Sequence, residues 1–121
     1  LAAAAAVASR LMLYALAYVL YRKGGGADSF ADSFEALWTH WDVRHYLGIA
    51  RDGYTNVGDA RLRLVFFPLY PAVTRVFSAF TGGNLFAAGT LVSLLCSGLC
   101  AALLYDLAAM YLGERISCSA R

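Results

Sequence analysis

The sequence predicts an all-α integral membrane protein with two transmembrane helices, or three on a second interpretation, joined by a loop that carries amphipathic interfacial helices. Two long apolar segments lie near the two ends of the chain. Hydrophobic residues make up 60% of the chain and charged residues only 15%, against about 25% in soluble domains. With a mean hydropathy of +0.58, the chain has too few polar residues to cover a soluble domain of this size. Lipid is therefore its expected solvent.

The first transmembrane helix is expected over residues 1–21, close to the roughly 20 residues that a hydrocarbon core requires. Arg10 interrupts this segment, and a charge at the helix centre costs about 2.5–3.5 kcal/mol on insertion scales. That cost falls if the helix begins further upstream or if Arg10 faces other helices. A cleaved signal peptide is the alternative. The apolar run, however, ends at Tyr21 and a basic pair rather than at a small-residue cleavage site.

Residues 22–84 are expected to form a loop with helices at the membrane surface. Asp32 and Ser33, followed by Glu35, are good helix-starting residues. Aromatic and aliphatic residues recur nearby at helical spacing, namely Phe30, Phe34, Leu37 or Trp38, and Trp41. We therefore expect residues 38–54 to lie on an amphipathic helix that rests on the membrane, with a turn after Arg51.

The segment from Leu64 to Phe80 is apolar and aromatic, but Pro68 and Pro71 interrupt it and it carries Arg75. Each proline removes a backbone donor and disfavours helix just before it. We expect an extended segment up to Pro71 and then a short helix at the membrane surface. A third transmembrane span is the alternative.

The second transmembrane helix is expected over residues 85–112, with Gly113 as its stop and residues 113–121 as a tail. Cys96 and Cys100, one turn apart, are expected to be small packing residues. Small residues recur every four positions, at Gly89, Ser93, Ser97 and Ala101. Such a stripe lets a neighbouring helix approach closely.

Polar chemistry concentrates in one stretch, WTHWDVRHYLGIARDGY, at residues 38–54. On a helix Asp42 and His45 share a face, so the Asp42 carboxylate is a candidate general base. The alternative is an interfacial helix that Trp and Tyr anchor and whose charges are only solvated. Arg44 and Arg75 are among the guanidinium groups that suit a phosphate, although nonspecific contact with lipid phosphates is the preferred interpretation of each one taken individually.

Metal and nucleic-acid sites have little support in the sequence. His40, Asp42 and His45 cannot converge on one ion, because neither a helix nor an extended backbone brings all three side chains together. We therefore assign no metal ligand. The net charge of +2 is too weak to indicate nucleic-acid binding.

The polar stretch, together with FFPLYPAVTRVF after it, resembles the PIG-V family of integral-membrane mannosyltransferases over residues 38–115. The resemblance depends on the order and spacing of several blocks rather than on any one of them. These blocks are Trp41-Asp42, His45-Tyr46, Ile49-Ala50, Gly53-Tyr54, and Phe66-Phe67-Pro68 with Pro71.

The resemblance implies the N-terminal portion of a multi-pass glycosyltransferase of the GT-C type, in a bacterial plasma membrane or the endoplasmic reticulum membrane. Its implied partners are a polyprenyl- or dolichyl-phosphate mannose donor, a glycan, glycolipid or protein acceptor, and membrane lipids. The loop would be extracytoplasmic or luminal and residues 113–121 cytoplasmic. Asp42 would be the catalytic carboxylate, and a divalent metal is left open. The implied substrate-binding residues are Arg44, His45, Tyr54, Phe67, Tyr70 and Arg75.

A different class of function stays open beside the enzyme. The chain could be a noncatalytic membrane protein, or a truncated remnant of the enzyme, that uses the aromatic and charged loop as an interfacial anchor. The tail, ISCSAR, departs from the apolar pattern expected of a following helix, and this fragment alone is expected to be inactive.

Overall fold

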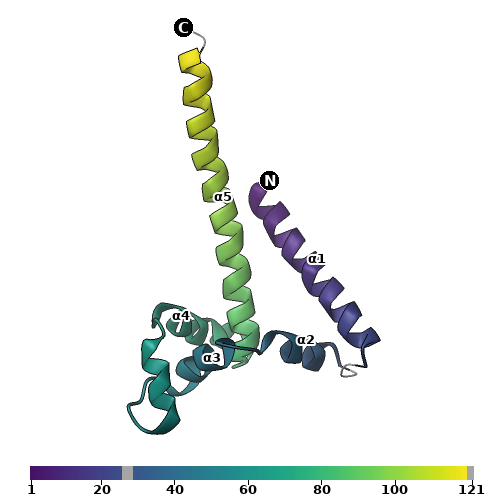
Figure 1. Cartoon of the computed structure of the whole chain (residues 1–121), viewed down its shortest axis with the longest axis vertical. Helices are drawn as coiled ribbons and strands as arrows, with labels where there is room; N and C mark the ends of the chain where they lie inside the picture. The colour runs from purple at the N-terminus through teal and green to yellow at the C-terminus, as the bar shows by residue number, and fades with distance from the viewer. Residues whose placement is uncertain (26–28, 120–121) are drawn as a thin grey trace.

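The computed structural model describes residues 1–25 and 29–119, with side chains as far as Leu112, and it contains helices and no strands in that part of the chain. Two long helices stand on a layer of short ones (Figure 1). The long helices are α1 (Ala2–Lys23) and α5 (Leu85–Ser119). The short elements are α2 (Phe30–Trp38), α3 (Val43–Asp52), η1 (Gly58–Val65), α4 (Leu69–Ser78) and η2 (Ala79–Thr81).

Helix α1 and the Leu85–Leu112 part of α5 are long and apolar enough to cross a membrane, which confirms the two predicted spans. Their large apolar side chains are mostly exposed, as expected for surfaces that face lipid. The prediction that Gly113 ends the second helix was wrong, because α5 continues to Ser119. A single glycine in a helix costs only about 1 kcal/mol relative to alanine, which does not stop a long helix by itself.

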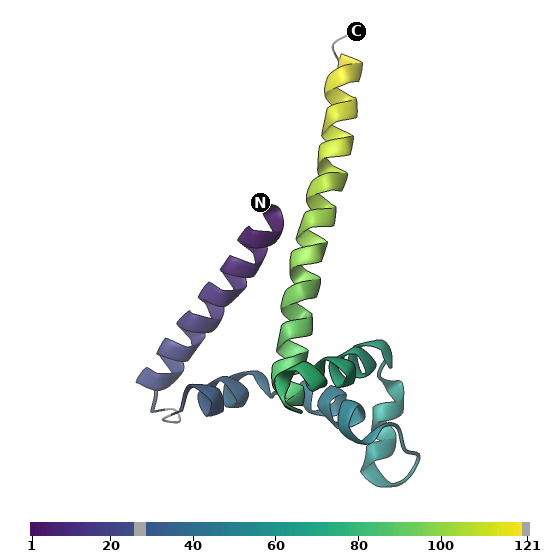
Figure 2. The same cartoon turned by 180° about the vertical axis from the view of Figure 1, so that it is seen from behind.

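The two spans form a V that is closed near the N-terminus of α1 and open toward the short helices (Figure 2). Gly98 makes the close approach: a Cβ there would lie 3.3 Å from Val7 Cγ2 and 3.9 Å from Ala3 Cβ. The small-residue stripe lies beside this contact. Its Ser93, Ser97 and Ala101 line a groove of about 570 Å³ between the spans.

Arg10 lies in the wall of that same groove, so it faces a second helix as one sequence expectation required. Ser9, Cys96 and Cys100 complete the polar part of the wall. Both cysteines are exposed, and their expected role as packed residues was therefore wrong. The groove between the spans leaves room around both thiols.

Helices α2, α3 and α4 lie across the foot of α5 rather than alongside it (Figures 1 and 2). The chain turns by 109° between Gly58–Val65 and Leu69–Thr81, so the possible third span is sharply bent, and we treat it as a surface segment. Helix α4 begins at Leu69, before Pro71, and the expected extended segment up to Pro71 was wrong. Pro71 falls in the first turn, where its missing N–H removes no helical hydrogen bond.

Aromatic rings fill the open end of the V. Tyr14 of α1 meets Phe34 and Trp38 of α2 edge-on, with ring centroids 5.1 and 5.2 Å apart. Phe34 also meets Phe86 of α5 edge-on at 5.8 Å. Edge-to-face pairs of this kind contribute about 0.5–1.5 kcal/mol each beyond their burial. Helix α2 thereby joins the two spans where they are furthest apart.

Helix α4 packs on α5 through the most buried part of the structure. Thr74 and Ala88 have no exposed surface, and Val92 retains 5%. The Tyr70 hydroxyl donates to the Gly89 carbonyl oxygen over 3.1 Å, and a Cβ on Gly89 would lie 2.8 Å from that hydroxyl. A side chain at residue 89 would therefore displace the Tyr70 hydroxyl from this hydrogen bond.

We expect Gly98→Leu to separate α1 from α5, because overpacking a close contact costs about 1–3 kcal/mol. The measurement is cross-linking by a bis-maleimide between Ala4→Cys and Leu95→Cys, two positions that line one groove at the contact, in a chain without its native cysteines. The cross-linked fraction should fall severalfold. The matched variant Ala108→Leu, on the exposed outer part of α5, should leave it unchanged. Equal cross-linking in both variants would contradict the contact at Gly98.

Candidate active site

Asp42 stands immediately before α3, at a break in the backbone that the sequence did not indicate. The predicted single helix over residues 38–54 was wrong: α2 ends at Trp38 and α3 begins at Val43. Trp41 lies between them with a φ of 54°, a conformation that costs a bulky side chain energy. Its indole is 92% exposed, so Trp41 does not continue the apolar face of α2.

The Asp42 side chain is exposed, and within the described part of the chain its carboxylate makes no hydrogen bond or ion pair. Its carbonyl oxygen accepts from the backbone N–H groups of His45 at 3.0 Å and Tyr46 at 3.1 Å. These bonds start α3, so Asp42 lies beside the positive end of that helix dipole. The backbone of Asp42 is therefore held by the start of α3, while its carboxylate is exposed.

Phe66 gathers three of the predicted substrate-binding residues into one aromatic cluster. His45 stacks on the Phe66 ring at 5.1 Å, and the Tyr54 hydroxyl donates to the Phe66 carbonyl oxygen over 2.6 Å. Tyr46 meets the edges of Phe66 at 5.0 Å and of Tyr70 at 5.4 Å. The cluster thus joins α3, the turn after it and the start of α4. We call it the Phe66 cluster.

Phe66 and Tyr46 belong to the sequence motifs, but neither was predicted to have a role in the site. Their signal was present in the motifs themselves, since one is the first Phe of the Phe-Phe-Pro block and the other follows His45. Local patterns could not show that rings twenty and twenty-one positions apart would be in contact, because that depends on how η1 returns the chain to α3.

The structure does not bring the remaining predicted residues into this cluster. Arg44 is about half a turn of helix from Asp42, and its Nε donates to the Thr39 carbonyl oxygen over 3.2 Å. Phe67 points outward and is 82% exposed. Arg75 is exposed near the C-terminal end of α4, away from the Phe66 contacts.

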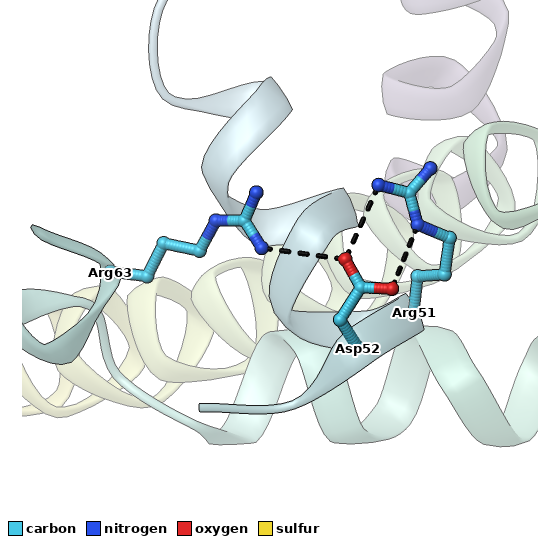
Figure 3. A network of polar contacts seen from close by, with 3 residues as sticks. All are labelled: Arg51, Asp52 and Arg63. Atoms are coloured by element: carbon cyan, nitrogen blue, oxygen red, sulfur yellow. Dashed lines mark hydrogen bonds and ion pairs between the residues drawn. The ribbon is translucent and has the colours of Figure 1, made fainter. Parts of the chain in front are cut away.

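A network of charged side chains fastens η1 to the end of α3 (Figure 3). Arg51 binds both oxygens of Asp52, at 3.0 and 3.3 Å, and Arg63 reaches Asp52 Oδ2 at 3.5 Å. The Arg63 guanidinium lies directly over Gly48, where a Cβ would be only 2.5 Å from its central carbon. A glycine in the middle of a helical pattern was the sequence signal for this close approach.

Arg51 determines the proton affinity of Asp52. Its hydrogen bonds lower the pKa of the Asp52 carboxyl below the ordinary value, against an opposing effect of desolvation and with help from Arg63. The same pairing raises the pKa of Arg51. The Arg51–Asp52 pair is solvent-exposed and contributes only modestly to stability, whereas the contact of Arg63 with Asp52 joins η1 to α3.

The described residues supply no further candidate ligands for a metal ion. The described residues include no group of three or more His, Cys, Asp and Glu side chains placed to hold a metal ion. His45 is stacked on Phe66 and Asp42 is exposed, so we assign no ligand to either. Involvement of a divalent metal stays an open prediction.

The fold and the cluster together define a membrane protein that presents a polar and aromatic surface at one end of its spans. Comparison with known proteins found no matching family model, no matching curated protein and no matching solved structure.

We expect the Asp52 network to weaken in acid. A carboxyl whose folded pKa is lowered contributes stability that is present above its unfolded pKa of about 3.9 and is lost as the pH falls through the folded pKa. The melting temperature, followed by tryptophan fluorescence in detergent, should therefore fall more between pH 5 and pH 3, roughly, for the wild type than for Asp52→Asn.

Asp59→Asn is the control for this experiment, because Asp59 is an exposed carboxylate in the first turn of η1 and lies outside the network. It should retain the wild-type dependence on pH. Identical slopes for the wild type and Asp52→Asn would show that the network contributes nothing measurable.

Proposed function

We propose that this chain is the N-terminal portion of a membrane glycosyltransferase that transfers mannose from a polyprenyl- or dolichyl-phosphate donor to a glycan, glycolipid or protein acceptor, with inversion. The observation that carries the proposal is the Asp42 carboxylate, held at the start of α3, exposed, and one helical turn from His45. The resemblance of the surrounding blocks to the PIG-V mannosyltransferases supports it. The sugar and the donor come from that resemblance alone.

In the proposed reaction Asp42 accepts the proton of the acceptor hydroxyl. The hydroxyl oxygen forms a bond to the anomeric carbon while the bond from that carbon to the lipid phosphate oxygen breaks, and the phosphate leaves with the electron pair. A single displacement of this kind needs one base on the face opposite the leaving group. The exposed carboxylate of Asp42, which has no side-chain partner among the described residues, can supply that base.

Supporting roles follow from the Phe66 cluster. His45 is held by its stack on Phe66 and can donate a hydrogen bond to the departing phosphate. Tyr54 and Tyr70 use their hydroxyls inside the protein, so they shape the cluster and offer ring faces to a sugar. Arg44 and Arg75 face elsewhere, and their predicted contacts with substrate would require the substrate to extend beyond the cluster.

The proposal places the short helices on the extracytoplasmic or luminal side and the end of α5 in the cytoplasm. The membrane would be a bacterial plasma membrane or that of the endoplasmic reticulum. A lipid-linked donor would approach within the bilayer, and its phosphate would meet the layer of short helices at the membrane surface. That layer is where the structure has Asp42 and His45.

A noncatalytic anchor is the second candidate, and the outward-facing side chains of the loop favour it. Several large apolar side chains of the short helices and their connections are exposed, including Trp41 at 92%, Phe67 at 82% and Val65 at 79%. Such side chains suit the interface between water and lipid. In this case Asp42 would be a solvated charge with no role in a reaction.

Replacement of Asp42 by Asn separates the two candidates. The assay follows transfer of radiolabelled mannose from polyprenyl-phosphate mannose in membranes, using the natural protein that contains this segment. Loss of a general base should lower the rate about 10²- to 10⁴-fold. Asp59→Asn, in an equally exposed position of the same layer, should retain the wild-type rate at equal expression. Unchanged transfer by Asp42→Asn would remove Asp42 from the mechanism.

A further inference from the structure

A second polar groove lies on the side of α3 opposite Asp42. It has a volume of about 510 Å³ and is formed where α2, α3 and the start of α5 meet. Arg44 and Arg51 line it together with Thr39 and Asn84, whereas Asp42 does not. Asp42 and Arg51 are nine positions apart, which is two and a half turns and places them on opposite faces of α3.

The cations in this groove have donors to spare. Arg44 spends Nε on the Thr39 carbonyl oxygen at 3.2 Å, and in the described part of the chain its two terminal nitrogens have no recorded partner. Arg51 shares Asp52 with Arg63, so one carboxylate faces two guanidinium groups. The Thr39 hydroxyl is shielded from water and lacks a hydrogen-bond partner among the described residues. The terminal nitrogens of Arg44 suit a phosphate oxygen, whereas the shielded Thr39 hydroxyl is not accessible to one.

An apolar groove of about 330 Å³ adjoins the polar one, and Glu35, Asn84 and Phe86 line both. Its remaining wall is almost entirely hydrocarbon and aromatic, from Phe30 and Phe34 of α2 to Leu91 and Leu94 of α5. The apolar groove therefore starts at the layer of short helices and continues along the membrane span. A polar end at the surface joined to an apolar channel along a span has the form of a lipid binding site.

We propose that these two grooves bind one phospholipid of the surrounding bilayer, with its phosphate at Arg44 and Arg51 and an acyl chain along Leu91 and Leu94. Glu35 at the junction opposes an excess of negative charge, so a phosphodiester headgroup fits better than a phosphomonoester. The site is separate from Asp42, and its occupant is a structural lipid that holds α2 and α3 against α5. This proposal does not depend on the proposed transferase activity.

The test is native mass spectrometry of the whole chain released from detergent with increasing dioleoyl phosphatidylglycerol. Arg44→Gln should weaken binding of the first lipid about tenfold, the scale of one charge-assisted hydrogen bond. Arg61→Gln, an exposed arginine of η1 outside both grooves, should bind as the wild type does. Dioleoylglycerol, which lacks the phosphate, should bind weakly and without sensitivity to Arg44→Gln.

A second variant keeps the proposal testable if Arg44→Gln disturbs folding. Leu91→Trp fills the apolar groove from an exposed position on α5 and should also weaken binding of phosphatidylglycerol. Equal lipid binding by the wild type and both variants would overturn the proposal. Displacement of the lipid by millimolar inorganic phosphate would overturn the lipid assignment as well, since it would show that the phosphate alone is recognised. Asp42→Asn should bind the lipid normally, so this test is independent of the transferase assay.

Discussion

The position of α4 on α5, and with it the site layer that packs on α4, depends on the close approach of Tyr70 to Gly89. Because residue 89 has no side chain, the Tyr70 hydroxyl reaches its carbonyl oxygen and α4 lies flat across the foot of α5. Thr74 and Ala88 are then completely buried. Helix α3 in turn packs on α4 through the Phe66 cluster. A large side chain at position 89 would displace Tyr70, and the contact that holds the layer of short helices on α5 would weaken.

This packing of α4 on α5 explains how a chain with few buried residues can hold polar groups in defined places. The layer presents two chemically different sides of α3. One side carries the open Asp42 carboxylate near His45, and the other carries Arg44 and Arg51 above an apolar groove. The first suits proton transfer at a membrane surface and the second suits a phosphate. The contact between Arg63 and Asp52 holds η1 against α3. Phe66, which follows η1, stacks on His45 of the same helix.

The two spans could be predicted from the sequence, because the length and hydropathy of a segment are local properties and they decide whether it can cross a bilayer. Of the six substrate-binding residues that the family resemblance implied, His45, Tyr54 and Tyr70 lie in the Phe66 cluster, whereas Arg44, Phe67 and Arg75 do not. Sequence reasoning missed the break at Trp41 and the start of α4 before Pro71, because tertiary packing and first-turn geometry decided both. It missed Phe66 as the centre of the cluster, since the contact joins residues far apart in the chain. The sequence shows that residues 89 and 98 are glycines, but it does not show which side chains pack against them.

Distances between spin labels would test the central claim most directly, namely that α4 seats the polar layer rigidly on α5. Labels at Asp59→Cys in η1 and Leu107→Cys in α5 would measure the distance between the layer of short helices and the membrane span. The measurement is made in nanodiscs, with the native cysteines replaced by alanine. If α4 is held on α5 by the contact at Gly89, the distances should form one narrow distribution, and Gly89→Leu should broaden it. A broad distribution in the parent chain, unchanged by Gly89→Leu, would show a loop tethered only at its ends and would contradict the account.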